Sequence, residues 1–398
     1  MKILQFCFRL PFPLNDGGAI AMYNMAKGFL ENGTELEILS YNTTKHYIDL
    51  NEVKDEIYSP KRVYEFPIDN AVKPLDALLN LFTSASYNIK RFESEEMKAF
   101  IRENFKDKHY DIIHFEGLFT APYLEVLREV MPKAKMVLRQ HNIEYKIWER
   151  MAEGASFPKN NYLTLLTARL KKYETALLPQ FDAIVPITEV DALALKGFNC
   201  TEYQVSSTGV DVEKFDAVQI AQKKNTIGFL GSLDWMPNQE GIKWFLDDVW
   251  GSIREKAPHI HLNIAGKNTP DWLMAYNNTK EHIHVVGLVD SAETFLKEQE
   301  VIIVPLLSGS GMRIKIIEAM AAKKAIVSTS VGAEGITISD ECILRDDPEE
   351  FAEAIVSLIA NKAEKQILEE KAYKLAVSTY SNKSKVNELV QYYKRLIS

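Results

Sequence analysis

Short runs of apolar residues alternate along the chain with longer segments in which apolar residues recur every three or four positions. The first runs predict strands at Lys2–Phe8 and Glu35–Tyr41, and the segment between them, Ile20–Glu31, has the period of a helix that ends at Gly33. Three further strands are predicted at Asp111–Phe115, Lys135–Gln140 and Asp182–Ile187. Strands that alternate with helices in this way predict a parallel sheet covered by helices on both faces.

A second series of the same kind begins near Asn225. Its predicted strands are Thr226–Leu230, His261–Ala265, His282–Val286, Val301–Leu306 and Ala325–Thr329. Two series predict an α/β protein with two doubly wound, Rossmann-like domains. We expect these domains at residues 1–200 and 201–378, followed by a helix within 379–398 that packs back on the first domain. Residues 49–105 are less regular and are expected to hold helices that decorate the first domain.

Composition narrows the class of protein. With 398 residues, 46% of them hydrophobic and 26% charged, the chain can bury two full cores. A net charge of −8 argues against general binding of nucleic acid, because neutralising phosphates supplies most of that affinity, so no nucleic-acid partner is expected. Arg9 ends the first apolar run too early for a signal peptide, no run has the length of a membrane span, and the three cysteines lie far apart. These features predict a protein of the reducing cytoplasm.

The strongest chemical signal follows the predicted strand Val301–Leu306. There the chain makes a turn of small residues and enters a helix at once; the turn consists of Ser308, Gly309, Ser310, Gly311 and Met312. The first amides of such a helix lack partners and point at the end of the strand, which is the arrangement of an anion site. Arg313 and Lys315 add positive charge there, although Lys315 and Glu318 also have the spacing of an ordinary surface ion pair.

The segment Glu318-Ala319-Met320-Ala321 resembles the second half of E-x-F-G-x-x-x-x-E-A-M-A, a motif of the retaining glycosyltransferases of the GT-B fold, family 4 (group 1). The resemblance implies two Rossmann-like domains facing across a cleft, with the donor diphosphate at Ser308–Met312 and its ribose on Glu318. Ser310 stands where the family has its first glutamate. The family's Arg and Lys after the first strand of the second domain are also missing, so we expect Arg313 and Lys315 to supply that charge.

The resemblance extends to other loops of the donor site. Gly17 and Gly18 precede the first helix, as in the family's Gly-Gly loop, although an ordinary tight turn has the same composition. In the second domain the resemblance implies donor contacts from residues that follow three predicted strands: Gly231, Ser232, Lys267, Gly287 and Leu288.

His141 directly follows a predicted buried strand, at the place where the family has a histidine that faces the sugar. We expect His141 to act in catalysis with Arg313 and Lys315; the alternative is a loop histidine satisfied by its neighbours. Glu116, Asn142 and Glu144 are predicted on the acceptor side, and Glu116 could equally be a solvated loop carboxylate.

The resemblance implies transfer of a hexose, with retention, from a donor such as a UDP- or GDP-sugar to a hydroxyl acceptor, in the assembly of bacterial surface polysaccharide or lipid-linked glycan. No metal and no cofactor are expected, because basic side chains and helix amides neutralise the leaving diphosphate. The alternatives are a catalytically inactive GT-B scaffold and a nucleotide-sugar epimerase. Residues 71–108 mix leucines with lysines and arginines, which predicts either peripheral contact with the inner membrane face or a packed helical decoration.

Overall fold

The structure is a computed structural model that describes residues 1–398 except 15–16, 154–155, 201, 208, 279 and 309–312. The chain forms two compact units. Unit 1 consists of residues 1–208 and 385–398, and unit 2 of residues 209–384. The division therefore follows residue 208, eight positions beyond the expected boundary at 200, and helix α17 (Asn382–Ile397) begins in unit 2 and belongs to unit 1 from Lys385 onward.

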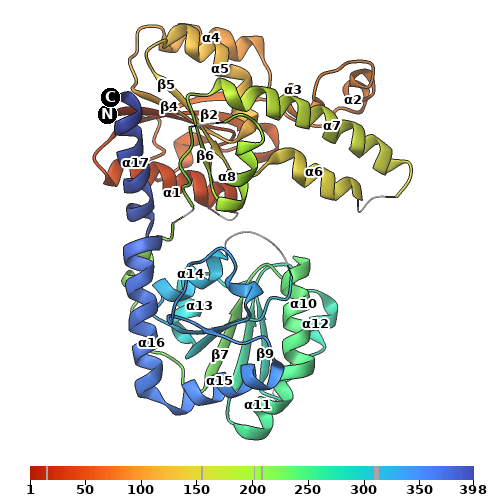
Figure 1. The fold of residues 1–398 in the computed structure, drawn as a ribbon, viewed down its shortest axis with the longest axis vertical. Helices are drawn as coiled ribbons and strands as arrows, with labels where there is room; N and C mark the ends of the chain where they lie inside the picture. Colours follow the sequence, from red (N-terminus) through yellow and green to blue (C-terminus); the bar gives the residue numbers. More distant parts are fainter. Residues whose placement is uncertain (15–16, 154–155, 201, 208, 279, 309–312) are drawn as a thin grey trace. The chain divides into compact units, whose positions relative to one another are not determined.

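Unit 1 is built on a six-stranded, parallel sheet in the order β3-β2-β1-β4-β5-β6 (Figure 1). The strands are β1 (Lys2–Cys7), β2 (Glu35–Thr43), β3 (Val63–Ile68), β4 (Ile112–Glu116), β5 (Lys135–Gln140) and β6 (Ala183–Pro186). In this order β1 lies beside β4. The chain continues from β1 to β2 on one side of this pair and from β4 to β5 on the other side. Ligands of doubly wound folds bind at this point, at the carboxyl ends of the strands.

Helices cover both faces of this sheet. They are α1 (Gly17–Glu31), α2 (Pro74–Asn80), α3 (Tyr87–Lys90), α4 (Glu95–Phe105), α5 (Leu124–Val130), α6 (Glu144–Glu153), α7 (Lys159–Leu177), α8 (Glu189–Lys196) and the greater part of α17. On one face α17 packs on α1, where Val386 occupies the space beside Gly28. A Cβ atom at position 28 would lie 2.4 Å from Cγ2 of Val386, so the two helices can approach only because this residue is glycine.

Unit 2 repeats the plan with a second parallel sheet, in the order β12-β11-β10-β7-β8-β9. Its strands are β7 (Thr226–Leu230), β8 (His261–Ala265), β9 (Ile283–Gly287), β10 (Val301–Val304), β11 (Ala325–Ser328) and β12 (Ile343–Leu344). Its helices are α9 (Val212–Ala217), α10 (Met236–Trp244), α11 (Trp250–Lys256), α12 (Asp271–Met274), α13 (Ala292–Glu298), α14 (Ile314–Ala321), α15 (Pro348–Ala360) and α16 (Lys362–Leu375). Here β7 lies beside β10, which makes their carboxyl ends the corresponding ligand position.

The structure confirms the predicted fold class and adds a strand to one edge of each sheet. β3 lies within residues 49–105, which were expected to hold helices, and β12 was not predicted at all. β3 is an outer strand in which the exposed Glu65 and Pro67 interrupt the apolar residues, so it lacks the continuous apolar run of a central parallel strand. Within the residues that the structure describes, no helix combines the length and the apolar character needed to cross a membrane.

Candidate functional site

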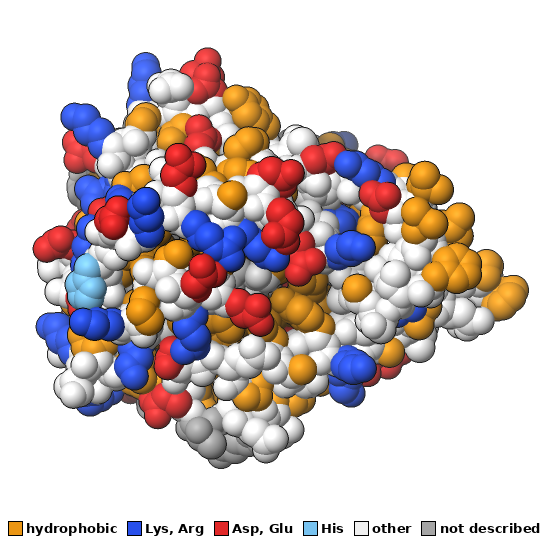
Figure 2. Space-filling model, turned by 90° about the horizontal axis from the view of Figure 1, so that it is seen from above, with side chains coloured by type: hydrophobic (Ala, Val, Ile, Leu, Met, Phe, Trp, Pro, Cys, Tyr) orange, Lys and Arg blue, Asp and Glu red, His pale blue; other side chains and the backbone are white. Residues whose placement is uncertain are grey.

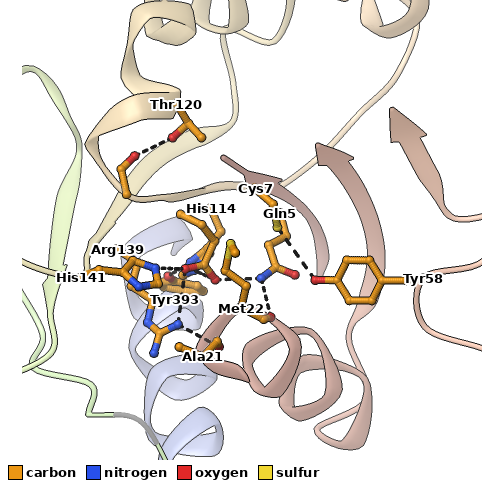
Figure 3. Close-up of polar contacts among 12 residues, drawn as sticks. Gln5, Cys7, Ala21, Met22, Tyr58, His114, Thr120, Arg139, His141 and Tyr393 are labelled. Carbon is orange, nitrogen blue, oxygen red and sulfur yellow. Dashed lines mark hydrogen bonds and ion pairs between the residues drawn. The ribbon is translucent and has the colours of Figure 1, made fainter. Parts of the chain in front are cut away.

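A buried carboxylate, Glu116, lies at the β1–β4 position of unit 1. Gln5, His114, Arg139 and His141, which surround it, are labelled in Figure 3. Glu116 ends β4 and is fully buried, and its Oε2 lies 2.7 Å from Nε2 of His141 and 3.3 Å from a guanidinium nitrogen of Arg139. Its Oε1 accepts a hydrogen bond of 2.7 Å from Gln5 and lies 3.2 Å from Nε2 of His114. Burial by itself raises the pKa of Glu116, but Arg139 and the two histidines outweigh burial and hold that pKa well below its usual range.

The burial of Glu116 corrects the prediction that it contacts the acceptor. Its side chain has no exposed surface, and both oxygens are occupied by donors from the protein. It can therefore influence a substrate only through a neighbour. His141, at the end of β5, retains 11% exposure of its side chain and is that neighbour.

The start of α1 belongs to the same edge of the sheet. Arg139 donates to the carbonyl oxygen of Ala21 over 3.1 Å, and Gln5 donates to that of Met22 over 3.0 Å. These bonds fix the first turns of α1, which begins at Gly17 and Gly18, next to the Glu116 network. Gly17 is exposed and a side chain there would meet open space, so the predicted donor loop is accessible.

A second buried carboxylate organises the segment after His141. Glu174 of α7 accepts from the backbone amides of Glu144 and Tyr145 over 3.1 and 3.0 Å, and from the side chain of Gln140 over 2.8 Å. It thereby caps the N-terminus of α6. Burial, with Glu174 nearby, raises the pKa of Glu144 to about 8, whereas Asn142 is exposed.

In unit 2 the amine of Lys315 lies at the carboxyl end of β7. Its Nζ donates to Oδ1 of Asn238 over 2.6 Å and lies 4.6 Å from the centre of the Phe229 ring. A Cβ atom on Gly231 would be 3.0 Å from the same Nζ, so the lysine lies directly against the glycine loop. Burial, reinforced by the charge of Arg313, lowers the pKa of Lys315 to about 7. An anion at this place would find a cation that water screens poorly.

The neighbouring predicted residues lie around α14. Arg313 immediately precedes the helix, is 4% exposed, and its guanidinium lies over the ring of Trp235, 3.8 Å from Glu334. Burial, with the charge of Glu293 nearby, raises the pKa of Glu318 to about 7. Ser308 donates to Glu240 over 2.5 Å. Four of the predicted donor residues lie outside the described part of the chain, namely Gly309, Ser310, Gly311 and Met312.

Three glycines bring the ends of β7, β8 and β9 close together. Gly231 donates to the carbonyl oxygen of Ala265, and Gly266 donates to that of Gly287. A Cβ atom on Gly266 would lie 1.7 Å from the carbonyl oxygen of Gly231, a distance that no side chain tolerates. Lys267 and Leu288 follow these glycines, and both are exposed. Ser232 is tied to Asn238, which donates to its carbonyl oxygen over 2.6 Å.

Residues 224–361 match the family "Glycosyl transferases group 1", and this match contains every predicted donor residue of unit 2. The chain has the GT-B fold, and its residues 224–361 form a group 1 glycosyltransferase domain. It is 23% identical over 397 residues to an uncharacterized 44.6 kDa protein in the cps region of Klebsiella pneumoniae, and this alignment covers 96% of the chain and 97% of that protein. It is 25% identical over 227 residues to the phosphatidyl-myo-inositol mannosyltransferase of Mycobacterium leprae, which covers 53% of this chain and 60% of that enzyme.

Among solved structures, the glycosyltransferase resembles HepE of Anabaena, whose crystal structure is a complex with UDP. The two share 12% sequence identity at a TM-score of 0.63, over 99% of this chain and 100% of HepE. At this identity the likeness establishes the fold, and it confirms the prediction of two Rossmann-like domains.

Several residues of the hydrogen-bond networks around Glu116, Glu174 and Lys315 were not predicted. They are Gln5, His114, Glu174, Asn238 and Tyr393. Gln5 and His114 lie within predicted strands, where a polar residue in an apolar run was the available signal. Glu174 and Asn238 lie outside the predicted elements, and Tyr393 lies in the helix expected within 379–398. Within the described part of the chain, no group of three or more His, Cys, Asp or Glu side chains is arranged to hold a metal ion.

Proposed function

We propose that this glycosyltransferase transfers a hexose from a nucleotide-diphosphate sugar to a hydroxyl acceptor, with retention of the anomeric configuration and without a metal ion. The observation that carries the proposal is the position of Lys315, whose half-buried amine lies against Gly231. Because Gly231 has no side chain, a diphosphate can approach the loop after β7 closely. The amine of Lys315 and the first amides of α14 offset the charge that develops as the diphosphate leaves.

The proposed donor is a uridine or guanosine diphosphate sugar. HepE, which has the same fold, binds UDP, and this favours uridine as the first choice to test. Glu318 lies one turn after Lys315 on α14, where its carboxylate would accept hydrogen bonds from ribose hydroxyls. Arg313 precedes the same helix and is proposed to add positive charge to the diphosphate site.

The proposed setting is the assembly of a bacterial surface polysaccharide. The relative in Klebsiella pneumoniae is named for its place in a cps region and aligns with nearly the whole chain, which supports a role of this class. His141 is proposed to contact the transferred sugar. Asn142 and Glu144, which follow it, are proposed on the acceptor side; the raised pKa of Glu144 suits a carboxyl that exchanges a proton near neutral pH.

A donor screen tests the proposal. Thermal unfolding is measured with UDP, GDP, ADP, CDP and their common sugar derivatives, because a ligand of the folded state raises its stability. Stabilisation by one base, followed by incubation with the matching sugar nucleotide, is expected to yield free sugar or glycoside whose newly formed anomeric centre has the donor's configuration. Conversion to an epimeric sugar nucleotide without any acceptor would instead identify an epimerase, and binding without turnover would identify an inactive scaffold.

We also propose that unit 1 contacts the inner face of a membrane through α2 and the residues that follow it. Leu75, Leu78, Leu79 and Phe82 are 55–86% exposed, so this part of residues 71–108 is not packed on the domain. The alternative of a packed helix holds for α4, whose Met97, Ile101 and Phe105 are buried in the core of unit 1. Figure 2 shows hydrophobic side chains gathered at its right-hand end, where Figure 1 has α2 and the turn between α6 and α7. Lys73 and Lys90 are exposed on either side of this segment, and their positive charges would attract anionic lipid headgroups.

A further inference from the structure

The imidazole ring of His141 is held on three sides. Its Nε2 lies 2.7 Å from Oε2 of Glu116, and Phe8 meets the ring edge to face with the two ring centres 5.9 Å apart. Gly117, with φ of +83°, leaves the space that both rings occupy: a Cβ atom there would be 3.3 Å from Phe8 and 3.9 Å from Cδ2 of His141. The ring therefore has one orientation, with Nε2 directed inward.

The other ring nitrogen is available to a ligand. Within the described residues, Nδ1 of His141 has no hydrogen-bond partner, and it is not among the polar atoms sealed from solvent. The side chain keeps 11% of its surface exposed, so this exposure includes the side of the ring opposite Glu116. A ligand at the β1–β4 end of the sheet would meet Nδ1.

The carboxylate of Glu116 determines which nitrogen of His141 carries the proton. An ionised carboxylate can only accept hydrogen bonds, and Glu116 is ionised because Arg139 and the histidines hold its pKa low. His141 must therefore donate through Nε2. In the neutral ring Nδ1 then has a free lone pair and acts as an acceptor.

The same logic fixes the proton of His114 and extends the network to α17. Nε2 of His114 lies 3.2 Å from Glu116 and must donate to it, which leaves Nδ1 to accept the hydroxyl hydrogen of Tyr393 over 2.6 Å. His114, Glu116 and Tyr393 have no exposed surface, so no water is needed to complete this chain. Burial lowers the pKa of His114, which keeps this ring neutral as the arrangement requires.

We propose that Glu116 is a positioning residue that fixes His141 with its proton on Nε2, so that Nδ1 accepts a hydrogen bond from a hydroxyl of the transferred sugar. Tyr393 supports this arrangement through His114. The proposal rests on the proposed function only in naming the ligand as a sugar. The proton positions follow from the network of this chain and can be tested without turnover.

The first experiment reads the protonation of the ring nitrogens directly. In protein carrying ¹⁵N-labelled histidine, the imidazole spectrum at about pH 8 is recorded for the wild type, and His141→Gln identifies the signals of His141. We expect a protonated Nε2 and an unprotonated Nδ1. In Glu116→Gln the proton is expected to distribute between the two nitrogens, whereas Glu129→Gln, which removes an exposed carboxylate of the same unit, is expected to leave the spectrum unchanged. A proton on Nδ1 in the wild type, or an identical spectrum in Glu116→Gln, would overturn the proposal.

The second experiment separates positioning from stability. Tyr393→Phe removes one buried oxygen and keeps the ring, so it serves even if Glu116→Gln does not fold. It is expected to lower kcat by roughly threefold to tenfold, the effect of one lost hydrogen bond, while the affinity for nucleoside diphosphate, measured by calorimetry, stays at the wild-type value. Glu116→Gln is expected to lower kcat by roughly tenfold to a hundredfold. Tyr393→Phe with unchanged kcat, or loss confined to nucleotide affinity, would contradict the role of the network. If the protein has no transferase activity, the proposed function fails and the spectra still decide the positions of the protons.

Discussion

The Nζ atom of Lys315 and the Oδ1 atom of Asn238 lie 2.6 Å apart, and the amide nitrogen of the same Asn238 donates to the carbonyl oxygen of Ser232. The lysine of α14 is thus tied to the loop after β7. This contact is absent from the sequence pattern, in which the two residues lie 77 positions apart.

Removal of the amine is expected to weaken nucleotide binding. Lys315→Ala should lower the affinity for the preferred nucleoside diphosphate about tenfold, the loss of one charge-assisted contact. Titration calorimetry measures the effect. Lys371→Ala, which removes an exposed lysine of the same unit, is the matched control and should bind like the wild type. Equal affinities for both variants would exclude Lys315 from the site.

The pH dependence of binding should have a maximum near pH 7. A diphosphate favours the charged form of Lys315, whose pKa in the free protein is about 7, so binding above that pH takes up a proton and affinity falls as pH rises. Ribose hydroxyls favour the ionised form of Glu318, whose pKa is also about 7, so binding below that pH releases a proton and affinity falls as pH decreases. Each limb changes by at most about tenfold per pH unit.

Two variants assign the limbs. Lys315→Arg keeps its charge across this range and should flatten the alkaline limb, and Glu318→Gln should flatten the acid limb. Because the ligand's own phosphate titrates near pH 6, the acid limb is read as the difference between wild type and Glu318→Gln. Calorimetry in buffers of different ionisation enthalpy counts the protons; an affinity that does not vary with pH would refute the assignment.

The approach of Gly266 to Gly231 should be costly to disturb. Gly266→Ala places a methyl group against a carbonyl oxygen that belongs to the backbone and cannot move aside, and it is expected to lower the free energy of unfolding by about 3 kcal/mol or more. Gly251→Ala is the control, because a side chain there meets open space on a helix, and it should not destabilise the protein. Denaturant unfolding compares the two, and equal midpoints would show that the loop can relax.

Membrane contact through α2 can be tested by flotation. The wild-type protein should float with vesicles that contain anionic lipid, and Leu78→Ser together with Phe82→Ser should remain in the soluble fraction, since both side chains are more than half exposed and their loss removes apolar area without opening the core. The control pair is Tyr47→Ser and Leu193→Ser, which removes two apolar side chains of unit 1 that are also more than half exposed but lie outside residues 71–108. No flotation of the wild type would exclude this contact.

The sequence pattern was sufficient to predict the central strands of each sheet, but it did not predict the edge strands β3 and β12. β1, β4, β7 and β10 read as continuous apolar runs because both of their faces are covered. β3 is half exposed and ends near Pro67, so its pattern is as compatible with a loop as with a strand. β12 has only two residues, which is too short for any periodicity to be visible.

The candidate site divides in the same way. The places of His141 and Gly231 directly after strands could be predicted, and both became candidates because topology assigns that edge of the sheet to ligands. The burial of Glu116 could not, because it depends on donors from β1, β5 and the neighbouring position of β4, and those partners are fixed only when the strands pair. Tyr393 lies 279 positions from His114, and no local pattern connects them.

The division of unit 1 between residues 1–208 and 385–398 also sets an order of events during synthesis. Val386, Leu389 and Tyr393 complete its core, yet all of unit 2 is translated before them. While unit 2 emerges, the face of α1 around Gly28 is uncovered and Nδ1 of His114 lacks the tyrosine hydroxyl. A chain arrested before residue 385 would carry unit 2 without a finished unit 1, so incomplete translation products would expose apolar surface and be recognisable to chaperones and proteases.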